Sequence, residues 1–80
     1  MTTAEKVIDI LAQATETDEV RQNVDLALFD EHLLDSLGLV QLVVALEEEL
    51  GIEIAPAEIE RAQFATPRRI VEFVESRVHA

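Results

Sequence analysis

The chain has 80 residues, of which 49% are apolar, and its 17 acidic and 6 basic side chains leave a net charge of −11. This length fits a single domain over residues 1–80 and leaves no room for a second hydrophobic core. The absence of cysteine excludes a disulfide framework and a thiolate metal site, and the negative charge disfavours nucleic acid and anionic lipid as partners.

The first helix is predicted over residues 3–15, followed by a long connection. Thr2 and Glu5 have the spacing of a capping box, and apolar residues then recur at helical spacing. Residues 16–35 lack clear periodicity but contain several apolar side chains. We therefore expect an ordered crossover with room for a short helical turn, anchored in the core by Phe29.

The second helix is predicted over residues 36–50, with Asp35 as its N-cap and Gly51 as its left-handed end. A helical wheel places one apolar face inward, made of Leu39, Leu42, Val43, Leu46 and Leu50. The other side mixes apolar, polar and acidic residues: Leu37, Val40, Gln41, Val44, Glu47 and Glu48. We call these six residues the docking strip, because exposed aliphatic groups beside acids favour a basic protein partner, although scattered surface aliphatics are also normal.

Two more helices are predicted in the last third of the chain. Pro56 begins a short helix that continues to Arg61, and Thr66 with Pro67 begins a final helix. Phe73 is placed at the edge of a buried face made of Ile70, Val71, Val74 and Val78. No strand pattern is present. The predicted fold class is therefore all-α, a four-helix bundle with three long helices, one short helix and a long first loop.

The sequence gives no sign of a membrane segment. No apolar run approaches the roughly 18 residues that span a bilayer, and the first residues lack a signal-peptide pattern. We expect a cytoplasmic protein and a monomer. A need for solubility would explain the acidic composition just as well as binding to a basic partner would.

Ser36 is the candidate for covalent chemistry, because it stands where the long connection meets the second helix. A catalytic triad with Asp35 and His32 is disfavoured, because adjacent Asp and Ser leave no room for an imidazole between them and no oxyanion loop is present. His32 and His79 are isolated, and the aspartates lack calcium-loop spacing. The residues therefore predict neither a catalytic site nor a metal site.

Asp35-Ser36-Leu37 at the start of an acidic amphipathic helix resembles the acyl and peptidyl carrier protein family. Leu42, Leu46, the triplet Glu47-Glu48-Glu49 and the final Thr-Pro helix extend the resemblance over nearly the whole chain. It implies an acyl-carrier-protein-like fold and 4′-phosphopantetheine from coenzyme A esterified to Ser36, with Asp35 and Leu37 beside it. It also implies a phosphopantetheinyl transferase as partner and no catalytic residues in the chain itself.

Gly38 after the motif, and the run from Pro56 to Pro67, are similar to the D-alanyl carrier subfamily of teichoic-acid D-alanylation. This similarity implies an adenylating ligase that loads D-alanine and a downstream acyltransferase that consumes it. That subfamily commonly has tryptophan where Phe64 stands and threonine where Leu39 stands. A discrete acyl or aminoacyl carrier of a polyketide, nonribosomal peptide or fatty-acid pathway is one alternative, and a non-covalent protein-interaction bundle is another.

Overall fold

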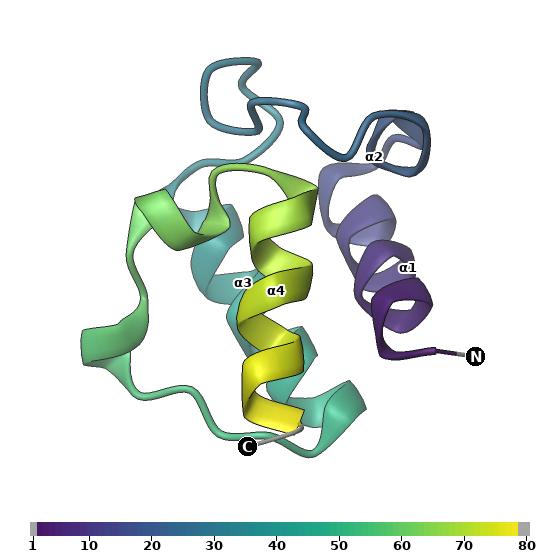
Figure 1. Cartoon of the computed structure of the whole chain (residues 1–80). Coiled ribbons are helices and arrows are strands. Elements are labelled where there is room, and N and C mark those ends of the chain that lie inside the picture. Colours follow the sequence, from purple (N-terminus) through teal and green to yellow (C-terminus); the bar gives the residue numbers. More distant parts are fainter. Residues whose placement is uncertain (1, 79–80) are drawn as a thin grey trace.

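Three long helices pack around a common core in the computed structural model, which describes residues 2–78 (Figure 1). The elements in chain order are α1 Thr3–Thr15, α2 Glu19–Gln22, α3 Ser36–Leu50, the 3₁₀ turns η1 Pro56–Glu58 and η2 Arg61–Phe64, and α4 Pro67–Val78. Helix α1 packs against both α3 and α4, and the long connection with α2 crosses one end of the bundle (Figure 1). The predicted all-α fold with three long helices and one short helix is confirmed for the described residues.

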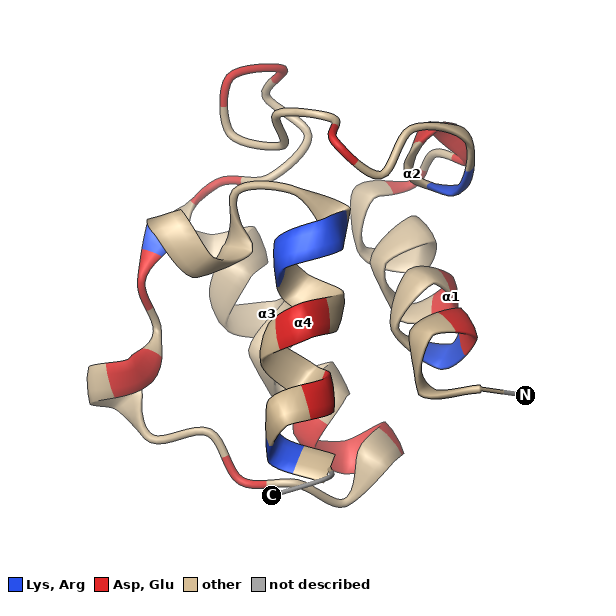
Figure 2. Ribbon diagram, in the orientation of Figure 1, with Lys and Arg blue, Asp and Glu red and all other residues tan. Residues whose placement is uncertain are grey.

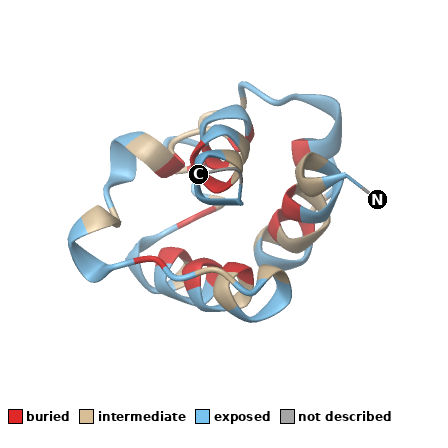
Figure 3. Cartoon of the chain, turned by 60° about the horizontal axis from the view of Figure 1, so that its bottom comes forward, coloured by how far each residue is buried: buried red, intermediate tan, exposed pale blue. Residues whose placement is uncertain are grey.

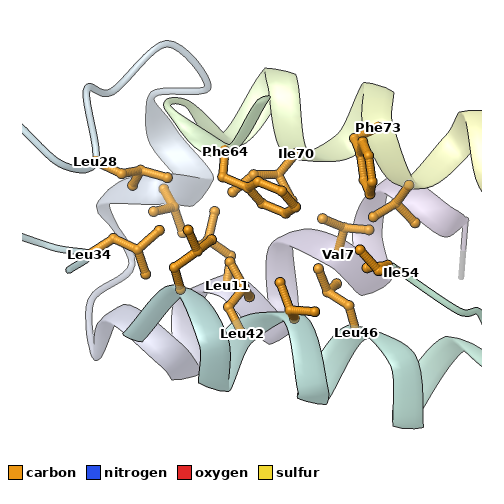
Figure 4. Packing of buried hydrophobic residues seen from close by; sticks show 14 of the residues in the cluster. Val7, Leu11, Leu28, Leu34, Leu42, Leu46, Ile54, Phe64, Ile70 and Phe73 are labelled. Carbon is orange, nitrogen blue, oxygen red and sulfur yellow. The ribbon is translucent and has the colours of Figure 1, made fainter. Parts of the chain in front are cut away.

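The core forms where the apolar faces of the three long helices meet (Figure 4). Fully buried side chains come from every part of the chain, among them Val7, Leu11, Leu28, Leu42, Leu46, Phe64, Ile70 and Val74. Seen from the end of the bundle, the buried parts of α1, α3 and α4 face one another and the exposed parts face outward (Figure 3). The inward face predicted for α3 is therefore correct, with Leu50 only half-buried at its end.

Local signals explain where the helices begin and end. The Thr2 hydroxyl accepts the Glu5 backbone N–H, and the Glu5 carboxylate accepts the Thr2 N–H, which completes the predicted capping box of α1. Gly51 ends α3 with φ +64°, the left-handed conformation that glycine adopts without steric cost. These local interactions explain why the predicted bounds of α1 and α3 agree with the structure.

The short helix predicted from Pro56 to Arg61 is wrong. The chain makes one 3₁₀ turn at η1, extends through Ile59 and Glu60, and makes a second turn at η2. Ile59 packs against the core from this extended stretch, and Phe64 is fully buried just beyond it. Since a continuous short helix would not bring both side chains to the core, tertiary packing overrides the local helical signal. The short α-helix of this fold is instead α2, in the first connection.

The core anchor predicted for the long connection also needs correction. Leu28, and not Phe29, is the fully buried anchor of the long connection, while Phe29 is half-buried. Leu28 is held by its backbone, because its N–H donates to the Ala65 carbonyl at 2.9 Å and its carbonyl accepts the Leu33 N–H at 2.9 Å. Phe29 packs against the core from its edge, so Leu28 is the more deeply buried residue of the pair.

The buried face of α4 is shifted from the predicted one. Phe73 is buried, whereas Val71 is half-buried and Val78 is exposed. The ring centroids of Phe73 and Phe64 lie 5.2 Å apart, so η2 draws Phe73 inward (Figure 4). None of the helices within residues 2–78 combines the length and apolar character that crossing a membrane requires.

Candidate functional site

Ser36 is the first residue of α3 and is exposed. Asp35 before it is extended, with φ −124° and ψ −175°, and its carboxylate accepts the Gly38 N–H at 2.6 Å. The Asp35 carbonyl accepts the Leu39 N–H at 2.8 Å, which begins the helical hydrogen bonding. Asp35 is thus the N-cap that the sequence predicts, and it holds the turn that presents the Ser36 hydroxyl to solvent.

Arg61 from η2 reaches this hydroxyl from a distant part of the sequence. Its Nη2 donates to Ser36 Oγ at 3.3 Å, across 25 positions of the chain. Its guanidinium carbon also lies 4.8 Å from the centre of the Phe29 ring, a cation–π contact. The long connection, the start of α3 and η2 therefore converge beside Ser36.

The docking strip lies along the outer side of α3. Its aliphatic members are exposed to different degrees, with 67% for Leu37, 52% for Val40 and 45% for Val44. Gln41 and Glu48 are exposed as well. Glu47 differs, because it is half-buried and its carboxylate accepts the Ile54 N–H at 2.9 Å. Helix α3 thus offers an apolar surface that begins next to Ser36, with Glu47 engaged in holding the chain that follows the helix.

Charge over the whole chain is predominantly negative, with a net charge of −11. Acidic segments mark the long connection and the C-terminal end of α3, and the few basic segments include η2 and both ends of α4 (Figure 2). An open groove of about 620 Å³ lies between α1 and α3, lined among others by Lys6, Ile10, Gln41 and Glu49. Ser36 does not line this groove. The hydroxyl therefore stands on an open surface and not inside this groove.

His32 lies exposed in the loop, with a left-handed φ of 59°. His79 lies outside the described residues. Between residues 2 and 78, the structure groups no three histidine or carboxylate side chains in a way that could hold a metal ion.

Comparison with known proteins identifies the family. Residues 5–74 match the family model described as the phosphopantetheine attachment site, which covers most of the chain. The chain belongs to the phosphopantetheine-binding family of carrier proteins. Phosphopantetheine is thus the cofactor of this carrier protein, as the resemblance implied, and membership of the family implies encounters with a ligase and a transferase.

Curated relatives of the carrier protein match almost end to end. The D-alanyl carrier protein of Listeria monocytogenes serotype 4b is 47% identical over 72 residues, which are 90% of this chain and 92% of the relative. That of Lacticaseibacillus casei is 46% identical over 69 residues, 86% of this chain and 85% of the relative. That of Enterococcus faecalis is 45% identical over 76 residues, 95% of this chain and 97% of the relative.

The sequence did not predict that Arg61 and Phe29 lie beside Ser36 in this carrier protein. The sequence holds one signal for Arg61, since it is the first basic residue after Arg21 in a strongly acidic stretch. That signal does not say which side chain Arg61 approaches. The contact with Ser36 depends on the path of the chain from Gly51 to Phe64, which only the structure shows.

Proposed function

We propose that this carrier protein bears 4′-phosphopantetheine on Ser36 and holds a D-alanyl group as a thioester on that arm. The observation that carries the proposal is the exposed Ser36 hydroxyl at the start of α3, inside the matched attachment region and beside an exposed apolar surface. The D-alanyl cargo is supported by the curated relatives, which are D-alanyl carrier proteins at 42–47% identity.

The surroundings of Ser36 fit a residue that is modified by another enzyme. Within residues 2–78, the hydrogen-bond partner of Ser36 Oγ is Arg61, whose guanidinium has hydrogen-bond donors and no acceptor. Ser36 therefore depends on a base of the transferase. Its oxygen then bonds to the pantetheine-side phosphorus of coenzyme A, the diphosphate bond breaks, adenosine 3′,5′-bisphosphate leaves, and the hydroxyl proton passes to the transferase.

The role of the chain is to present the arm and to bind successive partners. When attached, the arm supplies a thiol, with an ordinary pKa near 8.5, that carries the cargo. Asp35 holds the turn under the attachment point, and the docking strip gives partners an apolar surface. The proposed partners are a phosphopantetheinyl transferase, an adenylating ligase and a downstream acyltransferase. The proposed carrier is a single-domain monomer that has no catalytic residues of its own and works in the cytoplasm.

The attachment site can be tested by intact mass. After incubation with coenzyme A and a promiscuous transferase, the wild-type chain is expected to gain the mass of one phosphopantetheine. Ser36→Ala is expected to gain nothing. Ser76→Ala is the matched control, because Ser76 is the other serine of the chain and its hydroxyl is engaged with the Phe73 carbonyl at 2.6 Å. An unmodified wild-type chain, or equal modification of Ser36→Ala, would contradict the proposal.

The cargo is tested separately. The modified protein is offered to adenylating enzymes with a panel of amino acids, D-alanine included, and the thioester product is weighed. D-alanine is the expected cargo. Loading of another amino acid in place of D-alanine would reassign the cargo and leave the attachment to Ser36 intact.

A further inference from the structure

Arg61 is held in place beside Ser36 by a contact that does not involve the serine. The guanidinium lies over the ring of Phe29, which is half-buried and packs against the core. This cation–π contact, with the guanidinium carbon 4.8 Å from the ring centre, favours a guanidinium position beside Ser36 and does not use up its N–H groups. One of them points at Ser36 Oγ at 3.3 Å.

The charge of Arg61 is not used in an ion pair. Within residues 2–78, the ion pairs involve three other arginines: Arg21 with Asp9 and Asp18, Arg68 with Asp25, and Arg77 with Glu58. Arg61 thus stands next to Ser36 outside the ion pairs found among residues 2–78, in a chain of net charge −11.

A phosphate attached to Ser36 would benefit from a positive charge nearby. The N-terminus of a helix ordinarily offers backbone N–H groups to an anion. Here the Gly38 N–H already donates to the Asp35 carboxylate at 2.6 Å, and the Leu39 N–H donates to the Asp35 carbonyl. The Asp35 carboxylate also adds a negative charge beside the attachment point. Two N–H groups of the first turn are therefore already engaged, and the helix end offers only part of its donors to a second anion.

We propose that Arg61 binds the phosphate that joins the arm to Ser36. This inference rests on the proposed function, because it requires attachment at Ser36. The phosphorus of the arm is bonded directly to Ser36 Oγ and its non-bridging oxygens lie two bonds away, so a guanidinium that already reaches Oγ can reach the phosphate with little movement. Charge-assisted arginine–phosphate pairs are short and frequently bidentate. Arg61 then anchors the root of the arm between α3 and η2 and leaves the thiol end mobile.

The test compares Arg61→Gln and Arg61→Lys with Arg69→Gln. Arg69 is the matched control, since it is also an exposed arginine outside the ion pairs found in residues 2–78, and it makes no hydrogen bond to Ser36 there. Each protein is first modified with coenzyme A and a transferase, and complete modification is verified by intact mass. Circular dichroism checks that each variant is folded before its spectra are compared.

The readout is the ³¹P NMR resonance of the attached phosphate. We expect Arg61→Gln to shift it by more than a linewidth from the wild-type position and Arg69→Gln to leave it unchanged. Arg61→Lys should give an intermediate shift, because lysine keeps the charge but loses the planar fork. High salt should move the wild-type resonance toward that of Arg61→Gln, since screening weakens an exposed ion pair.

A second readout follows the arginine itself. The Nε–Hε resonance of Arg61 should move when the arm is attached, and that of Arg69 should not. Identical ³¹P positions in fully modified wild-type, Arg61→Gln and Arg61→Lys proteins would overturn the inference and leave the proposed function standing. Failure of every protein to gain mass would instead overturn the proposed function.

Discussion

Asp35 caps α3 and lies next to the residue proposed to carry the arm. Its carboxylate makes a 2.6 Å hydrogen bond to the Gly38 N–H, and the Cβ that an alanine would add at Gly38 would lie 3.1 Å from the same carboxylate. Gly38 therefore leaves the room that this close cap needs. The presentation of Ser36 depends on one side-chain hydrogen bond, which substitution can remove.

Asp35→Ala is expected to lower the free energy of unfolding by about 1 kcal/mol, the usual cost of losing an N-cap. It should also slow attachment of the arm, because a frayed first turn presents Ser36 in many orientations. Thermal unfolding and the rate of mass gain measure the two effects. Asp35→Asn should retain the stability, since asparagine caps equally well.

The control for this prediction is Asp30→Ala. Asp30 is exposed in the long connection and takes part in no side-chain hydrogen bond found among residues 2–78. Its substitution should leave both measurements close to wild type. Equal losses in Asp30→Ala and Asp35→Ala would show that the cap does not stabilise α3.

The ion pair between Arg68 and Asp25 makes the stability of the fold depend on pH. Arg68 donates to both carboxylate oxygens of Asp25, at 2.9 and 3.2 Å, and these bonds lower the pKa of the Asp25 carboxyl below its usual value. Because the folded pKa lies below the unfolded one, the pair stabilises the fold above the unfolded pKa of about 3.9. That stabilisation disappears as the pH falls through the folded pKa.

Asp25→Asn is therefore expected to lower the unfolding temperature slightly at neutral pH and low salt. The difference from wild type should vanish at pH values below the folded pKa of Asp25. Both side chains are exposed, so added salt should also reduce the difference. Unfolding curves over a pH series measure this effect, and a difference that stays constant with pH would rule out the ion pair as its cause.

At the scale of elements, α3 has two faces that differ in burial. One face is fully buried at Leu42 and Leu46, and the other leaves Val40 and Val44 about half exposed. The wheel calculated from the sequence predicted both faces. Substituting one residue on each face therefore distinguishes an effect on stability from an effect on the proposed partner binding.

Val44→Asp is expected to change the free energy of unfolding by no more than about 0.5 kcal/mol, as is usual for surface positions. It should strongly impair loading by the ligase, because a charge replaces part of the apolar docking surface. Leu46→Ala, the control on the buried face, should cost about 2–5 kcal/mol. Chemical denaturation and a thioester-loading assay distinguish the two variants, and a large loss of stability in Val44→Asp would place Val44 in the core.

The connection from Gly51 to Thr66 is the element that the sequence predicted least well. Between its two 3₁₀ turns it is extended, with Ile59 half-buried and Glu60 exposed. Ile54 and Phe64 belong to the core, and Ile59 packs against it. A search for helical periodicity cannot find such a segment, because the apolar residues of the segment are not regularly spaced along the sequence. Their positions depend on where the chain passes over the helices. The same segment brings Arg61 to Ser36.

At the scale of the whole molecule, the charge is uneven as well as large. Residues 1–60 contain Lys6 and Arg21 as their basic residues, and the remaining arginines lie between residues 61 and 80. Acidic segments are therefore spread over the long connection, which leads to the proposed attachment site, and over the C-terminal end of α3 (Figure 2). Such a surface attracts partners with basic patches.

Association with the ligase is thus expected to slow by ~10-fold or more from low to high salt. Glu48→Gln, in the docking strip, should lower the low-salt rate more than Glu72→Gln, an exposed control on α4. Stopped-flow kinetics over a salt series measures both effects. A rate independent of salt would show that apolar contacts alone guide the encounter.

The sequence by itself determined the features that depend on neighbouring residues. It predicted the bounds of α1 and α3, the caps at Thr2, Asp35 and Gly51, and the two faces of α3, because caps and helical periodicity act within a few positions of the chain. It also identified Ser36 as the candidate site, since a serine after an N-cap lies at an exposed helix end.

Only the tertiary structure decided which distant segments meet. It buried Leu28 more deeply than Phe29 and packed Phe73 against Phe64. It also formed the hydrogen bond from the Ile54 N–H to the Glu47 carboxylate, and it brought Arg61 next to Ser36 across 25 positions. The physical reason is that these contacts follow from how three helices and two irregular connections share one small core. No local pattern records that arrangement.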